Sequence, residues 1–224
     1  MHTTIMTKIP DMNKPVIVIG TGGHAKVLID ALNLSGRKVI GLTDPVKKPG
    51  ENFFGVNVLG SDDEVLRFST NEIRLVNGLG SLPENSLRLK LTNKMEANGY
   101  QFTEVIHPSA IIANDVTLEN GVQIMAGVII QTGTKVGRSS IINTGVIVEH
   151  DCNLNDDCHL APGVTLSGGI TIGRGSHIGT GTSIIHGITI GKNCIIAAGS
   201  IIHKNIPDDV FFMQKRQERL VEKE

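Results

Sequence analysis

The hydrophobic pattern of the chain changes near residue 105. From Ile106 to Ile202 every sixth residue is a branched aliphatic, without exception or insertion. A six-residue period fits neither an α-helix nor an alternating strand, and it is typical of a parallel β-helix made of hexapeptide repeats. Three hexapeptides form one triangular coil, and successive coils stack at about 4.8 Å, the spacing of neighbouring strands. We therefore expect an all-β solenoid over residues 105–207.

The repeat also predicts which other positions face the core. Because side chains alternate along a strand, the residue two before each aliphatic points inward and the residue one before it points outward. The inward positions hold mostly small or β-branched residues, and they include all three cysteines of the chain, Cys152, Cys158 and Cys194. We expect these thiols to be buried core groups rather than disulfide partners or metal ligands. Glycines recur three residues after many of the aliphatics, where a corner favours a positive φ.

The first hundred residues alternate strand and helix patterns. A buried strand (16–19) leads through a glycine-rich turn into a helix (25–34), and a second strand (39–42) ends just before Asp44. Such alternation is typical of a small Rossmann-like α/β domain with a parallel sheet. We place this domain at residues 14–104, after a flexible leader (1–13), and we expect residues 208–224 to form a tail.

Three further elements are expected within this domain. Ser61 and Glu64 have the spacing of a capping box at the start of a short helix. A third strand follows over residues 73–78, and a second helix begins after Pro83 and runs to Gly99.

The composition of the chain limits the kinds of partner that it is expected to bind. The net charge is −1 and aromatic residues make up 3% of the chain, so neither a basic surface nor stacking platforms for nucleic acid are indicated. No apolar run is long enough to span a bilayer, and the N-terminus lacks the apolar segment of a signal peptide. Together with the buried thiols, these features predict a protein of the reducing cytoplasm.

The glycine turn is the first chemical motif. Gly20, Gly22 and Ala25 have the spacing G-x-G-x-x-A where a strand passes into a helix, so backbone N–H groups and the helix dipole can meet a phosphate. Asp44 could accept a hydrogen bond from a ribose hydroxyl. A dinucleotide and a nucleotide sugar would both use this arrangement. We favour a nucleotide diphosphate over NAD because the domain is short, and the turn could also be purely structural.

Histidines on the solenoid are the second motif. His150 lies at a corner between Glu149 and Asp151, and a carboxylate beside an imidazole fixes its tautomer and suits it to act as a general base. His159 and His177 are 18 residues apart at outward positions, so they should stack on successive coils. His186 should lie two coils from His150 on the same edge.

The spacing of these histidines predicts an assembly. His150 and His159 are half a coil apart, so they lie on different sides of one triangular prism. Both can serve one site only where two prisms meet. We therefore expect active sites between subunits, most simply in a homotrimer; an active monomer would contradict this.

The motifs together resemble the sialic-acid O-acetyltransferase and bacillosamine acetyltransferase family. They run in order through both domains as Gly20-Thr-Gly-Gly-His24-Ala-Lys26, Asp44, His107-Pro-Ser-Ala, Asn143, Glu149-His150-Asp151-Cys152, His159-Leu-Ala-Pro-Gly163 and Gly168-Gly169. The family consists of bacterial sugar acetyltransferases with a left-handed parallel β-helix, an exception to the usual right-handed crossover.

The resemblance implies a role for each part of the chain. Acetyl-CoA would lie between neighbouring β-helices, and the acceptor would be the amine of a UDP-linked 4-amino-4,6-dideoxy sugar. No cysteine or serine is placed to carry the acetyl group, so transfer would be direct. No metal is expected. The implied catalytic residues are His150 as base, Glu149 orienting it, Asn143 nearby, and His159 as a donor near the thioester carbonyl. Substrate-binding residues would be Gly22, Gly23 and His24 near the phosphates and Asp44 near the nucleoside; His159, Gly168, Thr180 and Ala198 would contact acetyl-CoA.

The chain departs from the family at its end and leaves alternatives open. Instead of the usual Gly-Asn-Pro-Ala closure, Ile206-Pro207 runs on to Phe211-Phe212 and a charged tail, which bears on the contact with the CoA adenine. An O-acetyltransferase of a sialic-acid-like nonulosonic acid would use the same base. A nucleotide-sugar-binding scaffold without catalysis is the non-enzymatic alternative. A zinc-dependent γ-type carbonic anhydrase is disfavoured, because no His-x-x-x-x-His pair is present.

Overall fold

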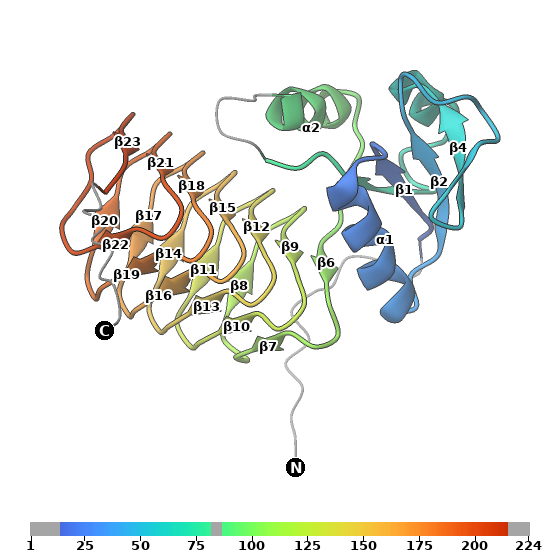
Figure 1. Cartoon of the computed structure of the whole chain (residues 1–224). Helices are drawn as coiled ribbons and strands as arrows, with labels where there is room; N and C mark the ends of the chain where they lie inside the picture. Colours follow the sequence, from blue (N-terminus) through green and yellow to red (C-terminus); the bar gives the residue numbers. More distant parts are fainter. Residues whose placement is uncertain (1–13, 82–86, 215–224) are drawn as a thin grey trace, which may run out of the picture.

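A computed structural model describes residues 14–81 and 87–214 of the chain. They form an α/β domain followed by a long triangular β-helix (Figure 1). The Rossmann-like domain and the left-handed parallel β-helix expected from the sequence are both confirmed. The leader 1–13, the start of the second predicted helix and most of the predicted tail lie outside the described residues.

The α/β domain is built on a five-stranded sheet with the order β3-β4-β2-β1-β5. All neighbours are parallel except the β3–β4 hairpin, which the sequence pattern did not indicate. The strands are β1 (Val16–Ile19), β2 (Val39–Thr43), β3 (Asn52–Phe53), β4 (Val56–Gly60) and β5 (Arg74–Asn77); the helices are α1 (Gly23–Leu34), α2 (Leu87–Ala97) and a 3₁₀ helix (Asp62–Arg67). Neither α1 nor α2, the α-helices of the described residues, has the length and apolar character needed to cross a bilayer.

The predicted capping box at Ser61 is wrong. Ser61 is the N-cap of the 3₁₀ helix, but its side chain makes no capping hydrogen bond. Instead, the backbone N–H of Glu64 bonds the Ser61 carbonyl at 3.0 Å, which closes a tight turn without the side chains. The spacing of Ser61 and Glu64 therefore did not produce side-chain capping. In a capping box the Ser61 hydroxyl would accept from the Glu64 N–H, but here that N–H bonds the Ser61 carbonyl.

Three parallel sheets form the sides of the β-helix, and the chain visits them in the order I, II, III. Sheet I contains β6 (Val105–Ile106), β9 (Gln123–Ile124), β12 (Ile141–Ile142), β15 (His159–Leu160), β18 (His177–Ile178), β21 (Ile195–Ile196) and β23 (Phe211–Phe212). Sheet II contains β7 (Ile111–Ile112), β10 (Ile129–Ile130), β13 (Ile147–Val148), β16 (Thr165–Leu166), β19 (Ser183–Ile184) and β22 (Ile201–Ile202). Sheet III contains β8 (Thr117–Leu118), β11 (Lys135–Val136), β14 (Asn153–Leu154), β17 (Thr171–Ile172) and β20 (Thr189–Ile190).

The predicted inward positions form the core of the β-helix. The second residue of each strand and most residues two before it pack into one apolar cluster that includes the three cysteines, and the small hydroxyl residues at the other inward positions of the coils are also buried. Burial raises the pKa of Cys158 to about 12, so this thiol stays protonated and serves as an apolar group. The glycines at the corners have positive φ as expected; at some corners an Asp, Asn or Ser takes the same conformation.

The two domains share a continuous interface. Met125, which follows β9, is fully buried in the cluster beneath α1, and the Arg88 guanidinium of α2 reaches the Ser139 carbonyl of the second coil at 3.3 Å. Arg138 adds an ion pair with Glu96 of α2 at 2.9 Å. As Figure 1 shows, α2 consequently lies over the first coils, on the side of sheet I.

Candidate active site

His150 projects from the corner between sheets II and III. The next residue, Asp151, has a left-handed backbone (φ 58°), which turns its side chain back toward the imidazole. The Asp151 Oδ2 lies 2.9 Å from His150 Nδ1. A carboxylate accepts this bond, so Nδ1 carries the proton and Nε2 presents its lone pair. This is the tautomer that a general base at Nε2 requires.

Within this chain the carboxylate bonded to His150 Nδ1 is that of Asp151, whereas the sequence led us to expect Glu149 to orient the ring. Glu149 is half-buried one position earlier, and its backbone carbonyl accepts a bond from Thr134 Oγ1 at 3.2 Å. Within residues 14–81 and 87–214 its side chain makes no hydrogen bond to His150. A contribution of Glu149 to catalysis stays a prediction.

The His150 ring occupies the space that a side chain at residue 168 would fill, which is free because this residue is glycine. Gly168 lies on the same corner one coil further on, and a Cβ built there would be 2.5 Å from both Cε1 and Nε2 of His150. His186, one coil beyond, brings its ring centroid to 6.4 Å from that of His150. The two imidazoles therefore flank the glycine corner, and His186 lies two coils from His150 on the same edge, as predicted.

His159 faces outward from sheet I but is covered by the α/β domain. It is 9% exposed, and its Nδ1 lies 3.0 Å from the Ser81 carbonyl. Since a carbonyl only accepts, Nδ1 carries the proton, and Nε2 accepts from the Asn143 amide at 3.3 Å. The ring of His177 meets His159 edge-on at 4.6 Å.

This environment keeps His159 neutral. Burial, followed by the neighbouring His177, lowers the pKa of His159 to about 3. With its proton directed at Ser81, His159 has no donor left at Nε2, which does not fit the expected donor role toward a thioester carbonyl. Asn143 likewise lies beside His159 within one chain, so an approach to His150 would have to come from another chain.

The glycine turn lies at the carboxyl ends of β1 and β2. Gly22 is the N-cap of α1 with φ −82°, and neither Gly22 nor Gly23 has any atom within 4 Å of a built Cβ. Packing therefore requires glycine at neither position, although glycine is among the residues favoured at a helix N-cap such as Gly22. Their missing side chains leave the N-terminus of α1 open to a ligand.

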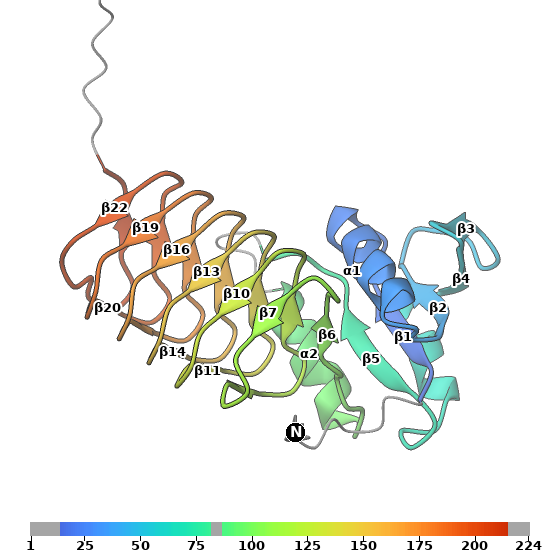
Figure 2. The same cartoon turned by 90° about the horizontal axis from the view of Figure 1, so that it is seen from below.

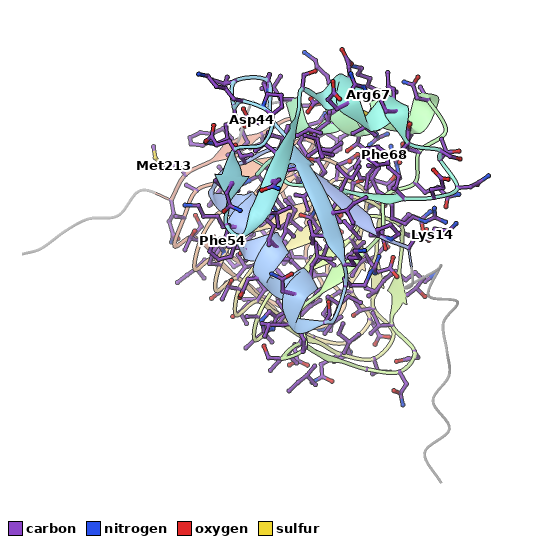
Figure 3. All side chains as sticks on the ribbon, turned by 90° about the vertical axis from the view of Figure 1, so that its right-hand side faces the viewer. Lys14, Asp44, Phe54, Arg67, Phe68 and Met213 are labelled. Atoms are coloured by element: carbon purple, nitrogen blue, oxygen red, sulfur yellow. The ribbon has the colours of Figure 1, made fainter. Side chains whose placement is uncertain are left out.

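Asp44, labelled in Figure 3, lies in the loop after β2 and is bonded to Thr21 of this turn. Its carboxylate accepts hydrogen bonds from the Thr21 hydroxyl and from the backbone N–H groups of Val46 and Lys47. Partial burial would raise the pKa of Asp44, but these bonds outweigh it and lower that pKa below its ordinary value. The ionised carboxylate thus ties the loop to the glycine turn.

His24, the second residue of α1, reaches across to the β-helix. Its Nε2 lies 2.7 Å from Oε1 of Gln123, whose amide donates to the Asn77 carbonyl at 2.8 Å. Burial lowers the pKa of His24 to about 4. Gln123 lies on the same outward row of sheet I as His159 and His177, a row whose members follow one another every 18 residues. That row could be read from the sequence; its covering by the α/β domain could not.

The low pKa values of His24 and His159 predict that acid destabilises the protein. Both imidazoles take up protons near pH 6.5 when unfolded but only near pH 4 and pH 3 when folded. Stability is therefore complete above pH 6.5 and falls below it, by roughly 2 kcal/mol for each histidine between pH 8 and pH 5. Urea unfolding at the two pH values measures this. The double variant His24→Gln, His159→Gln should lose the part due to these two rings, while His177, whose pKa burial also lowers, keeps its own part; an unchanged slope would contradict the prediction.

The predicted site residues fall on two edges of the β-helix. His150 and Gly168 lie on the corner between sheets II and III, whereas Thr180 and Ala198 lie on the corner between sheets I and II, next to the row of His159. One chain therefore brings His24, Asn143 and His159 toward one side and leaves His150 on another. Among the described residues, no group of histidine, cysteine or acidic side chains has the arrangement of a metal site.

Comparisons with known proteins match both domains. Residues 15–95 match the PglD N-terminal domain, and residues 169–204 match the bacterial transferase hexapeptide (six repeats). A search of curated proteins found no match.

Solved structures match nearly the whole chain. A mutant of perosamine N-acetyltransferase from Caulobacter crescentus, in complex with CoA and GDP-perosamine, is 37% identical with a TM-score of 0.81, over 88% of this chain and 92% of that one. The acetyltransferase domain of PglB from Neisseria gonorrhoeae, in complex with acetyl coenzyme A, is 29% identical with a TM-score of 0.80, over 87% and 93%. WeeI from Acinetobacter baumannii, at 24% identity, shares the fold, with a TM-score of 0.78 over 88% and 95%.

Proposed function

Because the chain belongs to the hexapeptide-repeat family of bacterial sugar acetyltransferases, we propose that it transfers the acetyl group of acetyl-CoA to the amine of a nucleotide-linked 4-amino-4,6-dideoxy sugar. The observation that carries this is the His150–Asp151 pair, which leaves a basic Nε2 at an open corner of the β-helix. The complexes of the relatives with CoA and GDP-perosamine support both substrates.

The acetyl group passes directly from CoA to the amine. The neutral amine attacks the thioester carbon while His150 Nε2 takes the amine proton, and Asp151 stabilises the imidazolium that forms. The C–N bond forms, the C–S bond breaks, and the CoA thiolate leaves and recovers a proton from His150. No acetyl-enzyme is needed, because the three cysteines are buried in the core of the β-helix.

The nucleotide end of the acceptor binds at the α/β domain. Its diphosphate meets the N-terminus of α1 at Gly22 and Gly23, where the dipole favours negative charge. Asp44 lies toward the nucleoside. An acceptor held at this domain extends to the covered row of sheet I, which contains His159.

An acceptor screen tests this function. Purified protein and acetyl-CoA are incubated with UDP- and GDP-linked 4-amino sugars and with free and CMP-linked sialic acid, and products are identified by mass. A gain of one acetyl group on a nucleotide amino sugar is expected. A gain of an acetyl group on the sialic acids alone would show that the acceptor is a hydroxyl, as in the O-acetyltransferase alternative. Transfer to none of them would favour the binding scaffold.

We also propose that the active site is completed in a homotrimer through sheet II. The outward row of this sheet begins with Ile111, Ile129 and Ile147, whereas the corresponding row of sheet III is polar, with Thr117, Lys135 and Asn153. Figure 2 shows sheet II as one broad face. Its two edges are the corner of His150 and the corner next to His159. A three-fold ring with this face toward the axis would join the first edge of one copy to the second edge of the next.

This arrangement predicts the effect of charge on sheet II. Ile129→Arg should convert a trimer into monomers and reduce acetyl transfer in parallel, because an arginine cannot be buried there without a partner. Thr117→Arg, on the polar sheet III, is the matched control and should leave both unchanged. Sedimentation velocity gives the oligomeric state. A fully active wild-type monomer would overturn the proposal.

A further inference from the structure

Gln123 links the two domains through a directional chain of hydrogen bonds. It is 1% exposed, on β9 of sheet I, and its side-chain amide donates to the Asn77 carbonyl at the end of β5 at 2.8 Å. The same carbonyl accepts from Arg88 Nη1 at 2.9 Å. Because a carbonyl can face only a donor, the nitrogen of the Gln123 amide is fixed toward Asn77, and its oxygen is fixed toward His24.

This orientation determines the protonation of His24. The Gln123 oxygen accepts, so His24 Nε2, at 2.7 Å, must carry the ring proton. The ring is neutral, since burial disfavours its charged form more strongly than the bond to Gln123 favours it, and the nearby Arg88 adds a smaller effect against the charge. The lone pair is therefore on Nδ1.

Nδ1 of His24 is available to a ligand. No described residue hydrogen-bonds it, and it is not among the buried unpaired nitrogens of the described side chains, which are Arg37 Nε and His177 Nδ1. It lies one residue from Gly23, at the open start of α1. An unprotonated nitrogen accepts hydrogen bonds and repels phosphate oxygens, which also only accept.

We propose that Gln123 is a positioning residue that holds His24 as a hydrogen-bond acceptor for a hydroxyl or amine N–H of the bound sugar. This inference rests on the proposed nucleotide-sugar substrate and changes one expectation from the sequence: His24 recognises the sugar rather than its phosphates. The phosphates are left to the backbone N–H groups at the start of α1. Gln123, a β-helix residue, thereby makes sugar recognition by the α/β domain dependent on correct docking of the two domains.

Nitrogen-15 NMR of labelled histidine in the intact protein tests the assignment directly. Comparison with His24→Gln identifies the signal of His24 among the eight histidines. We expect the proton on Nε2, exchanging slowly with water, and a neutral ring at pH 6. In Gln123→Leu this proton should exchange rapidly. A wild-type ring with the proton on Nδ1 would overturn the proposal.

Kinetics tests the consequence for the sugar. Gln123→Leu should raise the KM for the acceptor sugar about tenfold, the usual scale for one misdirected hydrogen bond, and leave the KM for acetyl-CoA unchanged. Gln101→Leu, an exposed glutamine, is the matched control. If Gln123→Leu folds poorly, Gln123→Met retains the side-chain length. An unchanged acceptor KM despite rapid proton exchange would refute the positioning role. If the wild type acetylates no nucleotide sugar, the proposed function fails while the NMR result still decides the tautomer.

Discussion

His150→Gln should lower kcat for acetyl transfer by roughly 10²- to 10⁴-fold, the usual contribution of a general base. The variant retains a polar side chain at the corner but has no nitrogen lone pair to take the proton of the attacking amine. Substrate binding should change little, since the amine and thioester are held by other groups. The rate is followed by mass detection of the acetylated sugar with acetyl-CoA in excess.

Two companion variants make this result specific. His203→Gln alters an exposed histidine of the same β-helix and should leave the rate unchanged. Asp151→Asn should reduce kcat less than His150→Gln, because the imidazole remains but its Nδ1–H loses a charged acceptor. A His150→Gln rate within threefold of wild type would show that another group is the base.

Gly168→Ala should reduce kcat by roughly 10²-fold, because a displacement of about 1 Å at a reacting group has that effect. The new methyl would lie 2.5 Å from Cε1 and Nε2 of His150, so the imidazole must swing away from the corner. The backbone at Gly168 has no positive φ, so alanine adds no backbone strain. The fold should survive, and the loss should appear in kcat at saturating substrate.

The control for this variant is an alanine at a corner away from His150. Gly127 has φ 69° and only the Gly145 Cα, at 4.0 Å, near a built Cβ. Gly127→Ala should therefore lower thermal stability through backbone strain while preserving kcat. If Gly168→Ala lowered stability and kept its rate, the close approach of His150 to Gly168 would have no part in catalysis.

Much of the β-helix could be predicted from the sequence because its geometry is periodic. The period of six assigns each residue to a sheet and a direction, so the burial of Cys152 and the alignment of His159 with His177 follow from counting. The neighbours of His150 follow in the same way, since Gly168 and His186 are one and two coils away.

Contacts between the domains could not be predicted, because no period relates them. Ser81 meets His159 and Gln123 meets His24 only once the α/β domain has docked on the first coils. The same docking buries His159, whose outward position alone indicates a solvated side chain. The repeat places Asp151 at a left-handed corner, but it does not say which of the two carboxylates beside His150 bonds the imidazole, since that depends on side-chain rotamers.

The stacked register also limits how this chain can change in length during evolution. Six inserted residues would rotate every later position by one side of the prism and turn the outward row of sheet II into a mixed surface. A whole coil added after Ala198 would merely lengthen the prism. A whole coil added between His150 and Gly168 would keep every residue on its proper side, yet it would replace the glycine beneath the imidazole. Changes in the length of this β-helix are therefore confined to whole coils, and to its C-terminal end.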